Sequence, residues 1–470
     1  MQGVLLADSI IIKNELEIFK RHKENRFLIL YSLILTSAFS PIKPLGYLVN
    51  FILIGGLIFF VQVKPKKNLM IYSLIMLACG AFAIFYWIIL PEFSFINYGL
   101  FLITFSSFLT FFFDFGNLLT VSLLKRMVRI TTIFLIIENC YGLLQALVSF
   151  SRVRTFDGTW GDMVRGTIEP AFTGSSRSGS MVFIFLISTC IMFIIAVSRF
   201  PFPKRRLWVI GFTIVIWVLA SAIHTIVFFV LAVALGILIN LFLCQDLRIP
   251  KWLWIAVSIM TISVLAMTLL GATLLPQNFS RIPIYVGLVF DIAPEAPLEK
   301  SRSIYHSVYS LPKEFFLQPV VGLGPGQYSS RAALMMSGEY LVGGSLPFRP
   351  YASSLMEKYI LELKHKMEER SHSSTNAPYF SWLTIYNETG MVGLMLMGFL
   401  VLKLIRNFTL QNSRDFPLMN ISMLILLFYM LLLGFQENYW EYTQGIFLAF
   451  FLLAISNHFI KRSRSTPLAS

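Results

Sequence analysis

The chain has 470 residues, of which 56% are hydrophobic and only 13% are charged, and its mean hydropathy is +0.73. Soluble globular domains of this length do not have such a composition. Solid apolar runs also exclude a membrane barrel, because its strands alternate polar and apolar residues over about 10 positions. The net charge of +14 does not point to nucleic acid, since the basic residues flank apolar runs and so orient membrane helices.

Apolar runs of about 20 residues, long enough to cross a bilayer as helices, recur along the chain. Residues 1–26 are charged and amphipathic, and we expect them to form a cytoplasmic segment on the membrane surface. Residues 27–274 are expected to hold the first nine spans, with a first external loop at residues 151–180. These spans are placed at residues 27–39, 45–63, 69–90, 96–113, 130–150, 181–198, a hairpin that turns at residues 221–224, and 252–274.

A polar-rich segment at residues 275–380 separates the ninth span from the tenth and is expected to be a large external loop that contains helices. Residues 381–457 hold the last three spans, at 381–402, 418–434 and 442–456, and residues 458–470 form a cytoplasmic tail. Basic residues follow each inward crossing in this scheme, as the positive-inside rule requires. The sequence therefore predicts an all-α polytopic fold of about twelve spans with both termini in the cytoplasm.

The predicted external loops are rich in arginine, which runs against the usual topological preference and so needs another explanation. One explanation is that the loops bind an anion, because a guanidinium group makes paired hydrogen bonds to phosphate. Arg165 and Arg302 are the first candidates for such a site, followed by Arg177 and Arg281. The alternative is that these arginines pair with carboxylates of the same loops, such as Glu169.

Three motifs lie in the predicted external regions. The first occupies residues 164–170 and reads Val-Arg-Gly-Thr-Ile-Glu-Pro. The second begins at Arg302 and continues through Pro319 to a glycine turn, Gly-Leu-Gly-Pro-Gly-Gln-Tyr, at residues 322–328. The third starts at Asn376 and ends with Glu-Thr-Gly-Met-Val-Gly at residues 388–393. In their order and predicted position these motifs resemble those of the O-antigen ligase and O-antigen polymerase superfamily, and the resemblance covers residues 130–402.

The resemblance implies a GT-C-like integral membrane enzyme of the bacterial inner membrane. Such an enzyme transfers a glycan from an undecaprenyl-diphosphate-linked donor to a hydroxyl of a lipid-linked acceptor, on the external face of the membrane. The expected glycosyltransferase is independent of metals and uses no other cofactor. Its expected partners are the donor and acceptor glycans, membrane lipids and a chain-length regulator protein, with no nucleic acid among them.

One departure from the family pattern bears on the reaction. Ligase members carry a His-Asn pair shortly before the third motif, where this chain has Tyr379 and Phe380, while His372 and Asn376 lie further upstream. This departure favours a polymerase of O-antigen or related surface polysaccharide over a ligase that transfers the glycan to lipid A core or protein. A transporter or flippase of lipid-linked sugars is the second alternative, although the two halves of the chain show no convincing inverted repeat.

The implied chemistry needs cations at the departing diphosphate and a group that accepts the proton of the attacking hydroxyl. The first task falls to the four arginines named above. For the second, His372 and Glu169 are the main candidates, with His306 and Glu388 behind them, and a solvated histidine or simple ion pairs are the alternatives. The residues expected to contact sugar or phosphate are Gly324, Gly326, Tyr328, Asn376 and Glu388. For the glycines, the alternative is a plain turn that needs positive φ angles.

Overall fold

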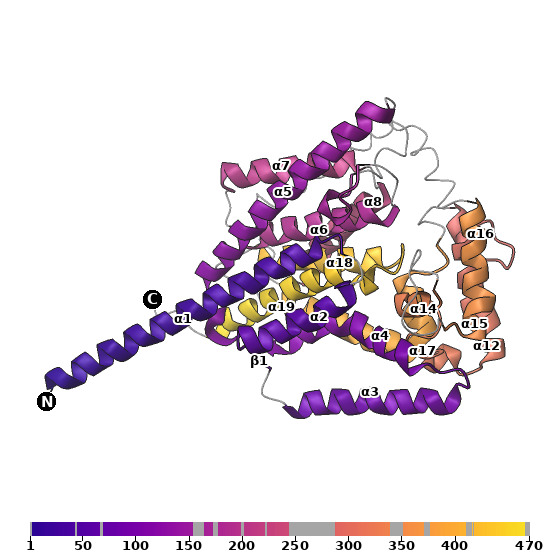
Figure 1. Ribbon diagram of the computed structural model, residues 1–470, viewed down its shortest axis with the longest axis horizontal. Helices are drawn as coiled ribbons and strands as arrows, with labels where there is room; N and C mark the ends of the chain where they lie inside the picture. The colour runs from indigo at the N-terminus through magenta and orange to yellow at the C-terminus, as the bar shows by residue number, and fades with distance from the viewer. Residues whose placement is uncertain are drawn as a thin grey trace.

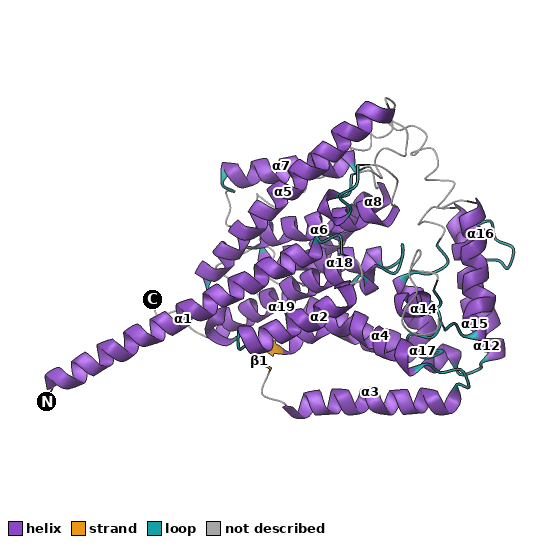
Figure 2. Cartoon of the chain, in the orientation of Figure 1, coloured by secondary structure: helices purple, strands orange, loops and turns teal. Residues whose placement is uncertain are grey.

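The computed structural model describes residues 2–42, 45–65, 69–153, 164–172, 177–198, 202–220, 223–243, 287–338, 351–370, 377–409, 416 and 418–465. Nearly all regular structure in this part of the chain is helical, as Figure 1 and Figure 2 show. The exception is a pair of two-residue antiparallel strands, β1 (Lys64–Pro65) and β2 (Phe113–Asp114), in which Lys64 faces Asp114.

The amino-terminal half consists of long helices joined by short connections. They are α1 (Gln2–Ala38), α2 (Leu45–Gly55) with the π-helix η1 (Gly56–Phe60), α3 (Leu69–Ile89), α4 (Phe95–Phe105) with the 3-10 helix η2 (Ser106–Phe112), η3 (Gly116–Leu118), α5 (Val121–Val153), η5 (Gly166–Ile168), α6 (Arg177–Ala196), α7 (Lys204–Leu219) and α8 (Ile223–Leu243). Helix α1 passes without a break through residue 26, where the sequence suggested a boundary between a surface segment and the first span. No glycine or proline lies between Gly3 and Pro41, so no residue of the kind that ends a helix interrupts it.

The carboxy-terminal half begins with the short helices of the predicted large loop and ends with three long apolar helices. They are α11 (Glu299–Tyr305), η6 (His306–Ser310), α12 (Leu311–Glu314), α13 (Gln318–Val321), α14 (Arg331–Met336), α15 (Ser354–Met356), η7 (Glu357–Leu361), α16 (Glu362–Arg370), α17 (Ser381–Thr409), α18 (Met419–Leu433), η9 (Tyr439–Glu441) and α19 (Thr443–Ser465). The described parts of residues 275–380 therefore contain helices.

Within the described residues, 6 helical segments are long and apolar enough to cross a membrane. They are Phe95–Phe112, Val121–Arg152, Gly179–Ala196, His224–Leu243, Ser381–Thr409 and Thr443–Arg462. Shorter apolar helices occupy Val49–Phe60, Leu77–Ile89 and Met419–Leu433. The chain is thus an all-α protein with several candidate membrane spans, while a total of about twelve stays a prediction. The predicted ninth span, at residues 252–274, lies outside the described residues.

The centre of the bundle is formed by α6, α18 and α19, which lie together in the middle of Figure 1. In the most apolar 18 residues of the spans Gly179–Ala196 and Thr443–Arg462, 94% and 89% are buried, against 17% in the corresponding part of α17. The ring of Tyr429 in α18 lies between those of Phe185 and Phe229, at centroid distances of 5.9 and 5.2 Å. The apolar part of α17 that follows its buried first turns therefore lies at the periphery of the bundle.

The helices of the large loop gather at one end of the bundle, on the right of Figure 1. The start of α1 and the end of α19 lie at the opposite end. The loop helices share a small apolar core, which includes Leu311, Tyr328, Leu334 and Ile360. This core gives the predicted large loop a packed centre of its own, on which polar side chains can be held in place.

Candidate functional site

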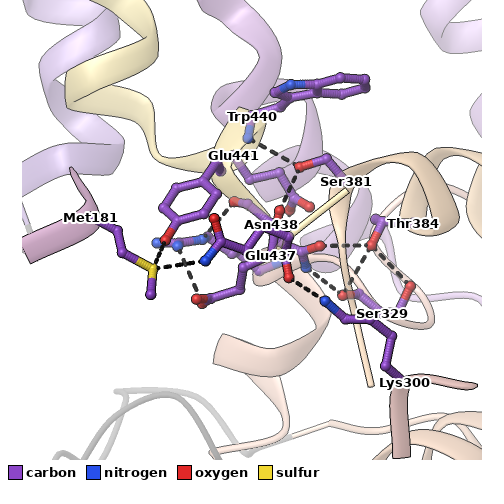
Figure 3. A network of polar contacts seen from close by, with 12 residues as sticks. Met181, Lys300, Ser329, Ser381, Thr384, Glu437, Asn438, Trp440 and Glu441 are labelled. Carbon is purple, nitrogen blue, oxygen red and sulfur yellow. Dashed lines mark hydrogen bonds and ion pairs between the residues drawn. The ribbon is translucent and has the colours of Figure 1, made fainter. Parts of the chain in front are cut away.

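Polar side chains converge on the turn between α18 and α19, residues 434–442, at the end of the bundle that carries the loop helices (Figure 3). The carbonyl of Glu437 accepts hydrogen bonds from the backbone N–H of Ser381, at 3.3 Å, and from its hydroxyl, at 3.1 Å. The same hydroxyl accepts the N–H of Trp440 at 3.1 Å. The first residue of α17 is therefore fixed to this turn.

A second set of bonds fixes the segment after the glycine turn. The amide of Asn438 donates to the carbonyl of Ser329 at 2.7 Å and its oxygen accepts the hydroxyl of Thr384 at 3.0 Å. The hydroxyls of Ser329 and Thr384 are 3.1 Å apart. All three side chains are buried, so the network joins the large loop, α17 and the 434–442 turn without solvent between them.

Arg331 and Glu441 form the charged part of this network. The N–H of Arg331 donates to Oε2 of Glu441 at 2.6 Å, and its Nε donates to the carbonyl of Asn438 at 3.0 Å. Its guanidinium lies 5.4 Å from the ring centroid of Tyr442 and 3.8 Å from Oε1 of Glu437. This arrangement holds a guanidinium in one orientation at the end of the bundle that carries the loop helices.

Glu441 is almost fully buried, and its Oε1 has no hydrogen-bond partner among the described residues. Burial, followed by the nearby charge of Glu388, raises the pKa of Glu441 well above its usual range. A buried carboxyl with one anchored and one free oxygen suits proton transfer more than ion pairing.

Lys300 supplies a second buried cation. Its Nζ donates to the carbonyl of Gln436 at 2.6 Å and lies 5.4 Å from the ring centroid of Phe380. Burial lowers the pKa of Lys300 to about 8, although the charge of Glu437 acts in the opposite direction. The ammonium is therefore held against the same turn as Arg331.

Met181, near the start of α6, is the point where the bundle meets this turn. Its sulfur accepts hydrogen bonds from Nε2 of Gln436, at 3.0 Å, and from the hydroxyl of Tyr439, at 2.7 Å. Nε2 of His224, at the start of α8, lies 3.3 Å from the same sulfur. The site thus draws on α6, α8, α11, α14 and the 434–442 turn.

The first motif is held by two side chains of α5. Oε1 of Gln145 accepts the N–H groups of Arg165 and Gly166, both at 2.8 Å. The N–H of Thr167 donates to Oε2 of Glu138 at 2.9 Å. Glu138 and Gln145 are buried, so the motif is docked on a membrane helix through the Gly-Thr pair itself.

The arginine of this motif pairs with its own carboxylate. Nη1 of Arg165 lies 2.8 Å from Oε2 of Glu169, and both side chains are largely buried. This contact is the ion-pair alternative that the sequence left open. The charges of Glu169 and Arg331 both act on Tyr442, so the first loop and the large loop approach each other at this ring. The arginine of the large loop at this contact is Arg331, which is not among the four arginines that the sequence singled out.

Arg302, in α11, makes a different contact. Its Nε donates to the carbonyl of Ala296 at 2.5 Å. Burial lowers the pKa of His306, and the charges of Glu362, Arg302 and the lysines of η7 and α16 act on this ring as well. The ring of His306 is 4.9 Å from that of Tyr359. Arg302 and His306 are therefore neighbours, as their spacing on a helix implied.

The glycine turn adopts the predicted left-handed backbone, with φ of 79° at Gly322, 89° at Gly324 and 81° at Gly326. A side chain at Gly322 would collide with the backbone of Glu388, and one at Gly326 would collide with the backbone of Asn97. These two glycines thus allow the turn to approach α17 and α4 closely. The turn packs on protein at both positions, which agrees with the plain-turn alternative.

Glu388 of α17 anchors the same turn through hydrogen bonds. Its fully buried carboxylate accepts the N–H groups of Gly326, Tyr328, Ser329 and Ser330 at 2.5–3.1 Å. Tyr328 is itself fully buried in the small core of the loop, where burial raises the pKa of its hydroxyl. Both residues therefore have structural tasks in positioning the loop.

Several predicted site residues cannot be placed. His372, Asn376 and Arg281 lie outside the described residues, and Arg177 begins α6 with its side chain outside them. Sequence reasoning missed Lys300, Arg331 and Glu441. A signal for Glu441 was present, since the run Gln-Glu-Asn-Tyr-Trp-Glu at residues 436–441 is unusually polar for a turn between two apolar spans.

Comparisons with protein-family models, with curated proteins and with solved structures find no match to this chain. Among the described residues, no group of three or more His, Cys, Asp or Glu side chains could hold a metal ion.

Proposed function

We propose that this chain is a membrane glycosyltransferase that polymerises undecaprenyl-diphosphate-linked oligosaccharide repeat units on the external face of the inner membrane. The observation that carries the proposal is the buried cluster of Arg331, Lys300 and Glu441 at the outer end of the bundle. The proposal also rests on the three motifs, whose order resembles that of O-antigen polymerases.

The proposed reaction releases a lipid diphosphate, so negative charge grows on the bridging oxygen as the glycosidic bond breaks. Cations that are fixed before the reaction stabilise this charge more than they stabilise the bound substrate. Arg331 is our first choice for this task, because four contacts hold its guanidinium and backbone in place. Arg165, from the first loop, and Arg302, from the large loop, are also proposed to bind the diphosphate. Arg177 and Arg281 are further candidates.

The acceptor hydroxyl must lose a proton as it attacks the sugar. The carboxylate form of Glu441 is proposed as the acceptor, because its Oε1 is unbonded among the described residues and its Oε2 is held by the N–H of Arg331. Glu169 is committed to Arg165 and is a weaker choice than its sequence position suggested. His372 stays a candidate from the sequence alone.

The test uses the purified protein in proteoliposomes with lipid-diphosphate-linked repeat units. A ladder of longer glycans on the lipid is expected from the unmodified protein, and Arg331→Ala should abolish it. Lys313→Ala, which removes an exposed lysine of the same loop, is the matched control and should leave the ladder unchanged. Failure of the unmodified protein to extend any glycan would refute the proposal.

Cells that lack the protein separate the alternatives. Single repeat units left on the lipid carrier or on its acceptor support a polymerase, whereas long chains that stay on the carrier support a ligase. Repeat units trapped on the cytoplasmic side support a flippase, and unchanged glycans would exclude all three.

A further inference from the structure

The α12–α13 elbow, residues 311–321, lies in the predicted external loop but carries large apolar side chains that protein does not cover. Phe316 is 78% exposed and Val320 is 53% exposed. A loop surrounded by water would gain nothing from these side chains. Their position relative to the membrane helices explains them.

The elbow is wedged between two apolar helices. Gly390 breaks the regular backbone of α17, with φ of 63° and ψ of −162°, and the backbone of Val320 and Val321 occupies the space where its side chain would lie. On the other side, the hydroxyl of Tyr86 in α3 donates to the carbonyl of Val321. The elbow is therefore fixed at a definite height along both helices.

That height can be estimated from helix lengths. The part of α17 from Gly390 to Leu402, which precedes the basic residues Lys403 and Arg406, is about 18 Å long at a rise of about 1.5 Å per residue, against a hydrocarbon thickness of about 30 Å. Helix α3 has 21 residues and so is about 31 Å long, and Tyr86 lies about 5 Å before its outer end. Both helices place Val321 in the outer half of the hydrocarbon core.

The flanking surfaces at this level are apolar as well. Met391, Met395 and Phe399 of α17 are exposed on the peripheral helix, and Trp87 and Ile88 are exposed at the outer end of α3. Tryptophan is typical of the boundary between acyl chains and headgroups. The elbow thus continues a lipid-facing surface that runs along two spans.

The backbone of the elbow can tolerate this environment, because irregular backbone at membrane depth needs its polar groups satisfied by protein. The N–H of Gly322 donates to the carbonyl of Gln318 at 2.8 Å, and the N–H of Leu323 donates to the carbonyl of Asn387 at 2.7 Å. The carbonyl of Val321 is bonded to Tyr86. The side chain of Gln318 is buried against Asn387 rather than turned outward.

The carboxylate of the elbow points the other way. Glu314 lies 2.5 Å from the ammonium of Lys358 and is bonded to the hydroxyl of Tyr359, both in η7. The elbow is therefore amphipathic, with the carboxylate of Glu314 toward the loop helices and the apolar side chains of Phe316 and Val320 uncovered by protein.

We propose that the α12–α13 elbow is inserted into the outer leaflet, with Phe316 and Val320 in contact with the acyl chains of bilayer lipids. The elbow then sets the depth of the glycine turn that follows it directly, and holds this turn at the membrane surface. The inference rests on the helix geometry and on the predicted external position of the loop, and it holds whether or not the protein is a glycosyltransferase.

The test measures the environment of position 316 in the full chain in nanodiscs. A nitroxide label at Phe316→Cys, in a chain whose native cysteines are replaced by alanine, is compared with labels at Phe399→Cys and Glu357→Cys. The first control is a lipid-facing residue of α17 and the second is an exposed residue of η7. Oxygen dissolves in the bilayer and the nickel chelate stays in water. At positions 316 and 399 alike, oxygen should therefore relax the label more strongly than the nickel chelate does.

A label at position 316 that favours the nickel chelate, as at position 357, would overturn the inference. Should the cysteine-free chain fail to fold, Phe316→Trp in the native chain supplies the same answer through quenching by brominated phospholipids. Its added fluorescence should be quenched, whereas that of Glu357→Trp should not. Equal, weak quenching of the two tryptophans would equally overturn the inference.

Discussion

Replacing Glu388 by alanine should detach the glycine turn from α17. The carboxylate is fully buried and accepts four backbone N–H groups of residues 326–330. Alanine offers no acceptor, and the turn lies between α4 and α17, where water has little access. The substitution therefore leaves buried donors without partners instead of exchanging one hydrogen bond for another.

The magnitude follows from the number of donors. An unsatisfied buried donor costs about 1–3 kcal/mol, so four at the lower end of this range cost about 4 kcal/mol. That is a large part of the about 5–15 kcal/mol by which folded proteins are stable. Glu388→Gln should cost less, because its amide keeps one acceptor oxygen while its N–H₂ group opposes the other donors.

Thermal unfolding of the detergent-solubilised protein and proteolysis of the large loop measure this effect together. Glu388→Ala should lower Tm and expose the loop to protease, Glu388→Gln should lie between it and the unmodified protein, and Glu357→Ala, at an exposed site, should change neither. A Glu388→Ala protein with unchanged Tm and unchanged protection would refute the reasoning, since the four bonds would then contribute nothing.

Three further predictions concern the same region. Gly322→Ala should lower Tm, because φ is 79° there and the added carbon meets the backbone of Glu388. Calorimetry in detergent measures this decrease. Burial lowers the pKa of Lys300 in the folded protein to about 8, from its ordinary value of 10.5. Between these two pH values the unfolded chain binds the proton more tightly than the folded protein does, so the stability of the fold should rise with pH across this window. Melting curves from pH 8 to 10.5 should show this rise, and Lys300→Met should remove it. Arg302→Ala and Arg302→Lys should both reduce the polymer ladder while protein levels stay normal, because a single ammonium cannot replace the guanidinium fork; full activity in both would exclude a diphosphate contact.

Elements whose causes are local could be predicted from the sequence. The hairpin was expected to turn at residues 221–224, and α7 ends at Leu219 while α8 begins at Ile223, with residues 221–222 outside the described residues. The three glycines of the turn adopt positive φ angles, as Gly-Leu-Gly-Pro-Gly implied. The length of an apolar run and the backbone freedom of glycine are determined within short segments of the sequence. These features can therefore be predicted without knowing which distant residues they contact.

The partners of the site residues could not be predicted, because they come from distant parts of the chain. Glu441 meets a backbone group 110 positions away at Arg331, and the four donors of Glu388 lie about 60 positions before it. No local sequence pattern tells whether Glu388 anchors the turn or acts as a catalytic carboxyl. The choice between Arg302 and Arg331 is of the same kind, since both lie close to the glycine turn in sequence and only the packing of α14 brings one of them to Tyr442.

The two buried carboxyls near the turn differ in what surrounds them, and this difference assigns their tasks. Glu388 receives four backbone N–H groups, which together satisfy both of its carboxylate oxygens. Glu441 has one oxygen anchored at Arg331, and the charge of Glu388 adds to the effect of burial in raising its pKa. One carboxylate thus holds the loop and, through its charge, acts together with burial to raise the pKa of the other. The anchor of the loop and the proton acceptor that we propose therefore interact electrostatically, so a shift of the loop would change the charge that Glu441 experiences.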